Sequence, residues 1–398
     1  MPRRLRGRFD SVIVPDQSAD EKFLRRALDR ARQGIGLASP NPHVGAVIVD
    51  SLGGIAGTGS YTYAGIKHAE VLALEQAGEK ARGGTLYVNL EPHCHQGRTP
   101  PCTDALIAAG IHRVVASMPD PNPKVSGKGF EQLRAAGVLV EVGGFEAEAR
   151  RLNEAFARYI RHGVPLVTLK SAMTLDAKIA PPPTERFKRE PGIPAGGWIT
   201  GEAARAHVQQ LRHASDAILV GVGTILADDP LLTDRSGNPR RRPLLRVILD
   251  SHLRLPSHSR LLQSSARQDA SQPDVLVFCS SGDQTKKREL QARGIRVKQV
   301  PAASDGKPDI HAILRCLGEL EITSVMIEGG STVNTMALAS GVVDKVFLYY
   351  APKILGDGSL PFSVSAEFPL PRRLRDIRIH HFDEDVAIEG YLRDPYTE

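Results

Sequence analysis

Two stretches, HAE at His68 to Glu70 and EPHCHQGRTPPC at Glu91 to Cys102, decide how the N-terminal part of this chain is interpreted. A catalytic zinc site needs three protein ligands, an open fourth position for water, and a nearby carboxylate that moves protons. His68 can supply one ligand and Cys102 another, and Glu70 fits the proton shuttle, which in such sites is not itself a ligand. The two stretches together therefore predict a catalytic zinc site.

The order of these two motifs resembles that of zinc-dependent deaminases of amino-substituted bases. The loop before Cys102 indicates which family of these deaminases the chain resembles. General cytidine and tRNA deaminases close their site with a short P-C-x-x-C, whereas this chain has a longer loop with GRTPPC at its end. Two further blocks flank it in order, SPNPHVGAVIV at Ser39–Val49 and VVASMPDPNPKVSGKG at Val114–Gly129. With these blocks the N-terminal half resembles the bifunctional deaminase/reductase family of riboflavin biosynthesis.

The third zinc ligand is where the chain departs from that family. The resemblance implies a cysteine directly after Pro92, but His93 stands there and Cys94 follows one residue late. We favour His93, because histidine is a good zinc donor. Cys94 is the alternative, although a step of one residue along a helix start turns the side chain by about 100°.

The exchange at His93 also leaves open a rival function, a reductase whose N-terminal domain has lost deamination and zinc. A nucleic-acid base deaminase is a second rival. The GRTPPC loop and the motifs of the second half disfavour it.

Composition agrees with an enzyme of two domains, since 398 residues are enough for two hydrophobic cores. No apolar run approaches about 18 residues, so no membrane span is expected. The formal net charge of +6 is dilute over this length, and no basic stripe interleaved with aromatic residues indicates nucleic-acid binding. Four cysteines, two of them in the zinc motif, argue against a disulfide framework and predict a cytoplasmic location.

Alternating strand and helix patterns predict an α/β fold. Residues 1–18 are expected to be a basic, disordered tail. We place a three-layer, cytidine-deaminase-like domain at 19–164, and the resemblance implies a dihydrofolate-reductase-like α/β domain at 165–398.

Individual helices and strands are predicted from the spacing of apolar residues and from the capping and turn residues at their ends. Apolar residues at helical spacing predict a helix over Asp20–Gly34, with Asp20 as its cap, and another over His68–Gly78. Short β-branched runs predict buried strands over Val44–Asp50 and Thr85–Glu91.

The second half carries motifs that resemble the NADPH-dependent reductase domain of the same family. They include LKSAMTLDAKIA at Leu169–Ala180 and VMIEGGSTVN at Val325–Asn334. Small residues in Gly221–Thr224 and Glu328–Thr332 allow backbone N–H groups to approach phosphate oxygens. No G-x-G-x-x-G follows the first strand, so a Rossmann cofactor site is not supported.

The resemblance implies roles for particular residues. Asn41 would orient the base in the deaminase site. Substrate contacts in the reductase half would be Gly196, Arg212, Leu232, Arg235 and Glu328, where Gly196 replaces a common serine and the arginines suit a phosphate. NADPH contacts would be Ala172, Trp198, Thr200, Thr224, Asp228, Ser251, Gly330, Ser331 and Thr332.

The run Arg240–Arg242 is interpreted as solvated surface, with contact to the 2′-phosphate of NADPH as the alternative.

The resemblance implies two consecutive reactions on a small phosphorylated pyrimidine. The substrate, 2,5-diamino-6-ribosylamino-4(3H)-pyrimidinone 5′-phosphate, would lose its C2 amine by zinc-dependent hydrolysis, with Glu70 moving the proton. NADPH would then reduce the ribosyl group to a ribityl side chain. A homo-oligomer, at least a dimer, is expected, and neither nucleic acid nor a membrane is an expected partner.

Overall fold

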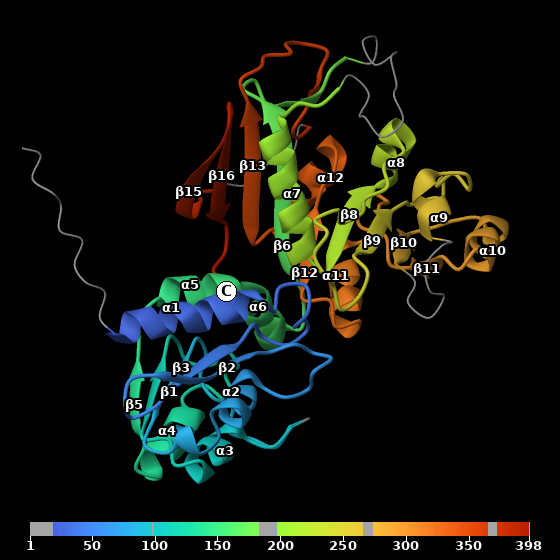
Figure 1. The fold of residues 1–398 in the computed structure, drawn as a ribbon. Coiled ribbons are helices and arrows are strands. Elements are labelled where there is room, and N and C mark those ends of the chain that lie inside the picture. The colour runs from blue at the N-terminus through green and yellow to red at the C-terminus, as the bar shows by residue number, and fades with distance from the viewer. Residues whose placement is uncertain (1–18, 98, 183–196, 266–273, 365–371, 398) are drawn as a thin grey trace, which may run out of the picture.

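The chain folds around two main sheets that divide between α6 (Glu154–His162) and β6 (Leu166–Thr174), as Figure 1 shows. The computed structural model describes residues 19–97, 99–182, 197–265, 274–364 and 372–397. The expected tail at 1–18 lies outside these residues. Among the described residues, no helix is both long enough and apolar enough to cross a membrane.

The N-terminal sheet has the order β2-β1-β3-β4-β5 and is covered on both faces (Figure 1). β1 pairs antiparallel with β2 and β3, whereas β3, β4 and β5 run parallel. α1, α5 and α6 lie on one face, and α2, α3 and α4 lie on the other, which confirms the predicted three layers. The bounds are α1 Ala19–Arg32, β1 Gly45–Val49, β2 Ile55–Ser60, α2 Ala69–Ala77, the 3₁₀ turn η1 Gly78–Ala81, β3 Thr85–Val88, α3 Cys102–Ala108, β4 Arg113–Ala116, α4 Lys128–Ala135, β5 Leu139–Val142 and α5 Glu146–Leu152.

The first helix buries the apolar face that its sequence predicts, but Asp20 is not its cap. α1 buries Leu24, Ala27, Leu28 and Ala31, one face of the helix, against the sheet. Asp20 does not cap it: the carboxylate accepts hydrogen bonds from Arg113 (2.6 Å) and from the hydroxyl of Tyr87 (2.7 Å). The acidic residue joins the helix to two neighbouring strands instead.

The C-terminal sheet is larger and mostly parallel, in the order β11-β10-β9-β8-β12-β6-β13-β16-β15. From β11 to β13 neighbouring strands are parallel, and β16 and β15 are added antiparallel. β7 and β14 form a small separate pair. Parallel strands end at a common edge, and ligands in open α/β sheets bind outside their carboxyl ends.

The remaining bounds are β7 Lys178–Ala180, α7 Glu202–Ala214, β8 Ala217–Gly221, α8 Val222–Asp228, β9 Leu245–Leu249, α9 Arg260–Ser265, β10 Val275–Cys279, α10 Gln284–Ala292, β11 Arg296–Gln299, α11 Ile310–Glu319, β12 Ser324–Ile327, α12 Ser331–Ala339, β13 Lys345–Ala351, β14 Leu360–Pro361, β15 Arg375–Phe382 and β16 Asp385–Tyr391.

After β16 the chain returns to the N-terminal domain. Tyr396 is 8% exposed and belongs to the same hydrophobic cluster as Leu28, Leu90 and Met118. Its hydroxyl donates to the carbonyl of Arg150 (2.8 Å), 246 residues earlier in the sequence. A residue from the C-terminal end of the second domain therefore completes the core of the first.

Candidate metal centre and reductase cavity

His68, His93 and Cys102 meet in the N-terminal domain, and one candidate ligand atom from each lies within 4.8 Å of the other two. His68 occupies the N-cap position of α2 without a side-chain capping hydrogen bond, and Cys102 is the first residue of α3. His93 lies in the loop that follows β3. His68 Nδ1 is 3.2 Å from Cys102 Sγ. Glu70, in the first turn of α2, is 3% exposed.

Close packing places the start of α2. A Cβ on Gly59 of β2 would lie 1.9 Å from the carbonyl oxygen of Ala69, so only glycine lets this helix approach the strand so closely. His68 directly precedes Ala69. The small residue in β2 therefore determines how near the histidine comes to the sheet.

The loop that carries His93 is held at both ends. The Glu91 carboxylate is buried and accepts backbone hydrogen bonds from Asp120 (2.9 Å), Gly127 (2.9 Å) and Gly129 (2.8 Å). At the other end the His93 carbonyl accepts from the backbone N–H of Cys102 (2.9 Å), at the start of α3. Two of the three candidate ligands are thus joined through the backbone.

The chemistry of the cluster fits a metal ion. His93 Nδ1 and Glu70 Oε2 are buried without a hydrogen-bond partner, which is costly unless a ligand satisfies them. Burial, aided by the nearby charge of His68, lowers the pKa of His93 to about 4 and keeps the imidazole neutral. Burial also raises the pKa of the Cys102 thiol, and Glu70 adds to this rise. A divalent cation would favour the thiolate form of Cys102 and use the free imidazole nitrogen.

The Thr99 side chain orients the ring of His68 from the side opposite Cys102. The Thr99 hydroxyl lies 3.2 Å from His68 Nε2, which leaves Nδ1 directed towards Cys102. Metal-binding histidines are commonly held in this way through their other ring nitrogen.

Among the residues that the structure describes, His93 and not Cys94 joins this cluster. Cys94 is half-buried, and burial together with the charge of Glu91 raises the pKa of its thiol. This placement makes His93 the candidate third ligand, and the choice of His93 over Cys94 stays a prediction.

Asn41 is connected to the cluster through Tyr61. The Asn41 side-chain amide donates to the Tyr61 hydroxyl (2.5 Å), and the Tyr61 ring makes an edge contact with the ring of His68 at 5.5 Å between centroids. Sequence reasoning did not single out Tyr61. Tyr61 and Tyr63 both follow β2, and nothing in the sequence distinguishes them.

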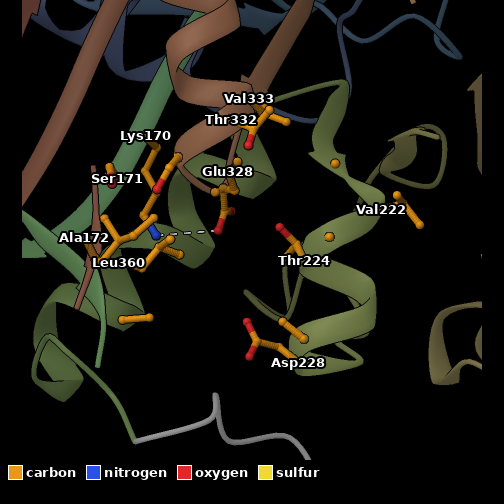
Figure 2. A pocket seen from close by; sticks show the side chains of 18 of the residues that line it. Lys170, Ser171, Ala172, Val222, Thr224, Asp228, Glu328, Thr332, Val333 and Leu360 are labelled. Carbon is orange, nitrogen blue, oxygen red and sulfur yellow. Dashed lines mark ion pairs between the residues drawn. The ribbon is translucent and has the colours of Figure 1, made fainter. Parts of the chain in front are cut away.

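The second domain contains a cavity of about 650 Å³ at the carboxyl ends of β8, β9 and β12, part of which Figure 2 shows. Thr224 and Asp228 on α8 face Glu328 and Lys170 across it. Twelve of the predicted cofactor and substrate residues line this cavity: Ala172, Trp198, Thr200, Arg212, Thr224, Asp228, Arg235, Ser251, Glu328, Gly330, Ser331 and Thr332.

Leu232 and Gly196 do not join this group. The structure does not bring Leu232 to the cavity, because its side chain is 5% exposed and packs in the hydrophobic cluster around Ile218 and Ile248. Gly196 lies outside the described residues.

An ion pair between two side chains that are each 12% exposed lines the cavity. Glu328 accepts from Arg212 Nε (2.8 Å) and from a second guanidinium nitrogen of Arg212 (3.1 Å). Lys170 Nζ lies 3.5 Å from the Glu328 carboxylate, the ion pair drawn in Figure 2. Burial alone would raise the pKa of Glu328, but Arg212 and Lys170 outweigh it and lower this pKa to about 2. Lys170 was not predicted, although a lysine inside the apolar run of β6 is a signal of function or pairing.

The two glycines before α12 have different surroundings. A Cβ on Gly329 would lie 2.6 Å from Cβ of Val333, so this glycine is needed for packing. A Cβ on Gly330, the N-cap residue of α12, would meet nothing within 4 Å. The backbone at Gly330 is therefore open to the cavity at a helix N-terminus, where anions bind favourably.

The interpretation of Arg240–Arg242 as a solvated run is wrong. The Arg240 side chain donates to the carbonyl oxygens of Arg212, His213 and Ser215. Arg241 lies over the ring of Tyr63 at 3.4 Å, and Arg242 pairs with Asp216 at 3.2 Å. None of the three lines the cavity of the second domain, so the 2′-phosphate alternative is not supported either. They lie where the two domains meet.

Models of known protein families match both domains. The RibD C-terminal domain matches residues 165–388, and the cytidine and deoxycytidylate deaminase zinc-binding region matches residues 17–118. This second match and the RibD type of the reductase domain assign zinc to the first domain and NADPH to the second.

Similar proteins span nearly the whole chain. The riboflavin biosynthesis protein RibD of Aquifex aeolicus is 43% identical, over 93% of this chain and 97% of that protein. The RibD protein of Escherichia coli strain K12 is 40% identical, over 85% of this chain and 89% of that protein.

Solved structures of RibD proteins are also similar to this chain over most of its length. RibD of Acinetobacter baumannii has a TM-score of 0.79 at 34% identity and covers 94% of this chain and 99% of its own. A Thermotoga maritima protein, described as a diaminohydroxyphosphoribosylaminopyrimidine deaminase/5-amino-6-(5-phosphoribosylamino)uracil reductase, has a TM-score of 0.76 at 36% identity and covers 94% of this chain and 98% of its own. With a zinc-binding deaminase domain followed by an NADPH-using reductase domain, the chain belongs to the RibD family of bifunctional enzymes of riboflavin biosynthesis.

Proposed function

We propose that the chain deaminates 2,5-diamino-6-ribosylamino-4(3H)-pyrimidinone 5′-phosphate at the His68, His93 and Cys102 cluster and then reduces the ribosyl group in the cavity around Glu328. The observation that carries this proposal is the convergence of three candidate ligands with a buried, unpartnered carboxylate oxygen of Glu70. Such an arrangement suits hydrolysis of an amino-substituted base.

In the first reaction His68, His93 and Cys102 would hold zinc. When bound, the metal would supply a Lewis acid that lowers the pKa of water towards neutrality. Glu70 accepts a proton from the water that attacks the C2 carbon and delivers it to the departing ammonia, as a buried carboxylate with one unpartnered oxygen can do. Asn41, held on the Tyr61 hydroxyl, orients the base beside His68.

In the second reaction the open backbone at Gly330 and the hydroxyl of Thr224 would contact NADPH, which would supply the hydride. Arg212 and Arg235 line the cavity and carry the charge that a substrate phosphate requires. Glu328 keeps the Arg212 guanidinium in place through two hydrogen bonds.

The test supplies the diaminopyrimidinone to the purified chain with and without NADPH. We expect ammonia and the deaminated ribosylamino compound without NADPH, and the ribitylamino product with it. Zinc content is measured on the same sample. NADPH oxidation on chemically deaminated substrate, with neither zinc nor ammonia release, would show that the chain is a reductase only.

We also propose that the enzyme is a cytoplasmic homo-oligomer. Ile377 and Ile379 on the edge strand β15 are 57% and 63% exposed, and an exposed apolar edge strand is a surface that another copy can pair with. The free state of all four cysteines supports a reducing compartment. Sedimentation of the parent and of Ile379→Lys tests the assembly, since the variant should shift towards the monomer.

A further inference from the structure

The segment that carries Asn41 lies at the contact between the two domains. We call this contact the seam and define it as residues 36–41 of the deaminase domain together with His213, Asp216 and Arg240–Arg242 of the reductase domain. Figure 1 shows loops of the N-terminal domain meeting the base of the C-terminal domain below α7.

The reductase domain holds the backbone of this segment by direct hydrogen bonds. The Arg241 guanidinium donates to the Ser39 carbonyl (2.5 Å), and the Arg241 backbone N–H donates to the Gly36 carbonyl (2.8 Å). The Ser39 hydroxyl donates to the buried Asp216 carboxylate (2.7 Å), which also pairs with Arg242.

Packing leaves this segment little freedom. Gly36 has φ +76°, and a Cβ there would lie 2.6 Å from the His213 ring, so the two domains touch at a position that only glycine fits. On the other side, the Tyr63 backbone N–H donates to the Leu37 carbonyl (3.0 Å), and the Tyr63 ring stacks under Arg241. The segment is clamped between Tyr63 and the reductase domain.

The clamp ends at the deaminase site. Asn41 follows Ser39 by two residues, and its amide reaches the Tyr61 hydroxyl, whose ring contacts His68. Asn41 of the deaminase domain therefore lies in a segment that is hydrogen-bonded to the reductase domain.

We propose that Arg241 and Arg242 are positioning residues for the deaminase reaction: the reductase domain holds Ser39 through them, so that Asn41 stays on Tyr61 beside His68. This inference rests on the proposed function, in which Asn41 orients the base. A group that orients bound substrate acts mainly on binding, so its displacement should raise KM more than it lowers kcat.

The experiment uses the full-length, zinc-loaded enzyme and the variant Arg241→Ala. Loss of a charge-assisted hydrogen bond should raise the deaminase KM about tenfold, with a smaller change in kcat. Arg241→Lys keeps a cation over Tyr63 and should recover part of the loss. Ser39→Ala removes the hydroxyl contacts with Asp216 (2.7 Å) and Arg242 (3.2 Å) but keeps the carbonyl that accepts from Arg241, so it should give a smaller rise than Arg241→Ala.

Arg150→Ala is the matched control. Arg150 also joins the two domains, stacks on a tyrosine (Tyr396, 3.9 Å) and pairs with a carboxylate (Asp394, 3.3 Å), but it does not contact residues 36–41. We expect its deaminase KM to stay at the parent value. Zinc content and the reductase kinetics on supplied deaminated substrate should be unchanged in Arg241→Ala.

An unchanged deaminase KM in Arg241→Ala would overturn the inference, as would an equal rise in Arg150→Ala, because domain docking in general would then explain it. Loss of zinc in Arg241→Ala would also contradict it, since the arginine would then support the fold rather than Asn41. A parent enzyme that releases no ammonia contradicts the proposed function itself, and that outcome is seen before any variant is compared.

Discussion

The metal cluster and the reductase cavity are built in different ways. His68 and Cys102 are 34 residues apart in the sequence, and with His93 they form a set of only three candidate ligands. The cavity draws on many segments; Arg212 and Glu328, for example, are 116 residues apart and come from α7 and the end of β12. A compact ligand set should fail completely when one member is lost, whereas a cavity with many contacts should respond by degrees.

Loss of a ligand is the sharpest test of this difference. His93→Ala should lose both zinc and deamination, because two protein ligands do not make a zinc site of this kind. Cys94→Ala should keep both, since Cys94 lies outside the cluster. Metal content by mass spectrometry and ammonia release measure this. If Cys94→Ala is the variant that loses the metal, the ligand register proposed here is wrong.

Glu70→Gln separates chemistry from metal binding within the same cluster. The variant should retain zinc and lose about 10²–10⁴-fold in deaminase kcat, the usual contribution of a general acid–base group. The reductase rate on supplied deaminated substrate is the internal control. Deamination at the parent rate would remove Glu70 from the mechanism.

In the cavity, Gly330→Val should weaken NADPH binding without abolishing it. The glycine has φ −79° and open space around its Cβ position, so valine adds bulk to the cavity without backbone strain. We expect the KM for NADPH to rise about tenfold, with the thermal unfolding midpoint almost unchanged. Gly329→Val is a contrasting variant, since its Cβ would meet Val333 and should destabilise the fold. Unchanged NADPH affinity in folded Gly330→Val would place the cofactor elsewhere.

The smallest expected effect concerns pH. The pKa of Glu328 is lowered from 4.5 to about 2 by Arg212 and Lys170 against the effect of burial. A depressed carboxylate pKa stabilises the fold above the ordinary pKa, and this contribution is lost as pH falls from about 4.5 towards 2. The thermal midpoint of the parent should exceed that of Glu328→Gln by a few degrees at neutral pH, and the difference should shrink over that window. A constant difference down to pH 2 would contradict the assignment of charge to this pair.

The sequence predicted the cluster better than it predicted the seam. His68, Glu70 and Cys102 occur in motifs whose spacing reflects local structure, and the predicted strand and helix around them are present as β3 and α2. The partners of Arg240–Arg242 are Asp234, Asp216, Tyr63 and backbone carbonyls, distant in sequence or without any sequence signal. Adjacent arginines therefore resembled a solvated run, since only tertiary structure reveals what neutralises them.

Leu232 and Asp20 show the same limit on a smaller scale. Leu232 was assigned a substrate contact by resemblance, but its side chain is directed into the core. Asp20 was assigned as a cap from its position at the start of α1, but Arg113 of β4 is a stronger partner. Local pattern identifies which residues can perform a role, and competition among distant partners decides which of them do.

The return of Tyr396 to the N-terminal core has a consequence for biosynthesis. A ribosome makes Leu28, Leu90 and Met118 long before Tyr396, so the nascent deaminase domain emerges with an apolar site still unfilled. During translation that surface must stay exposed or be covered by a chaperone. The domain that is made first therefore completes its core only after the strands of the second domain have been made.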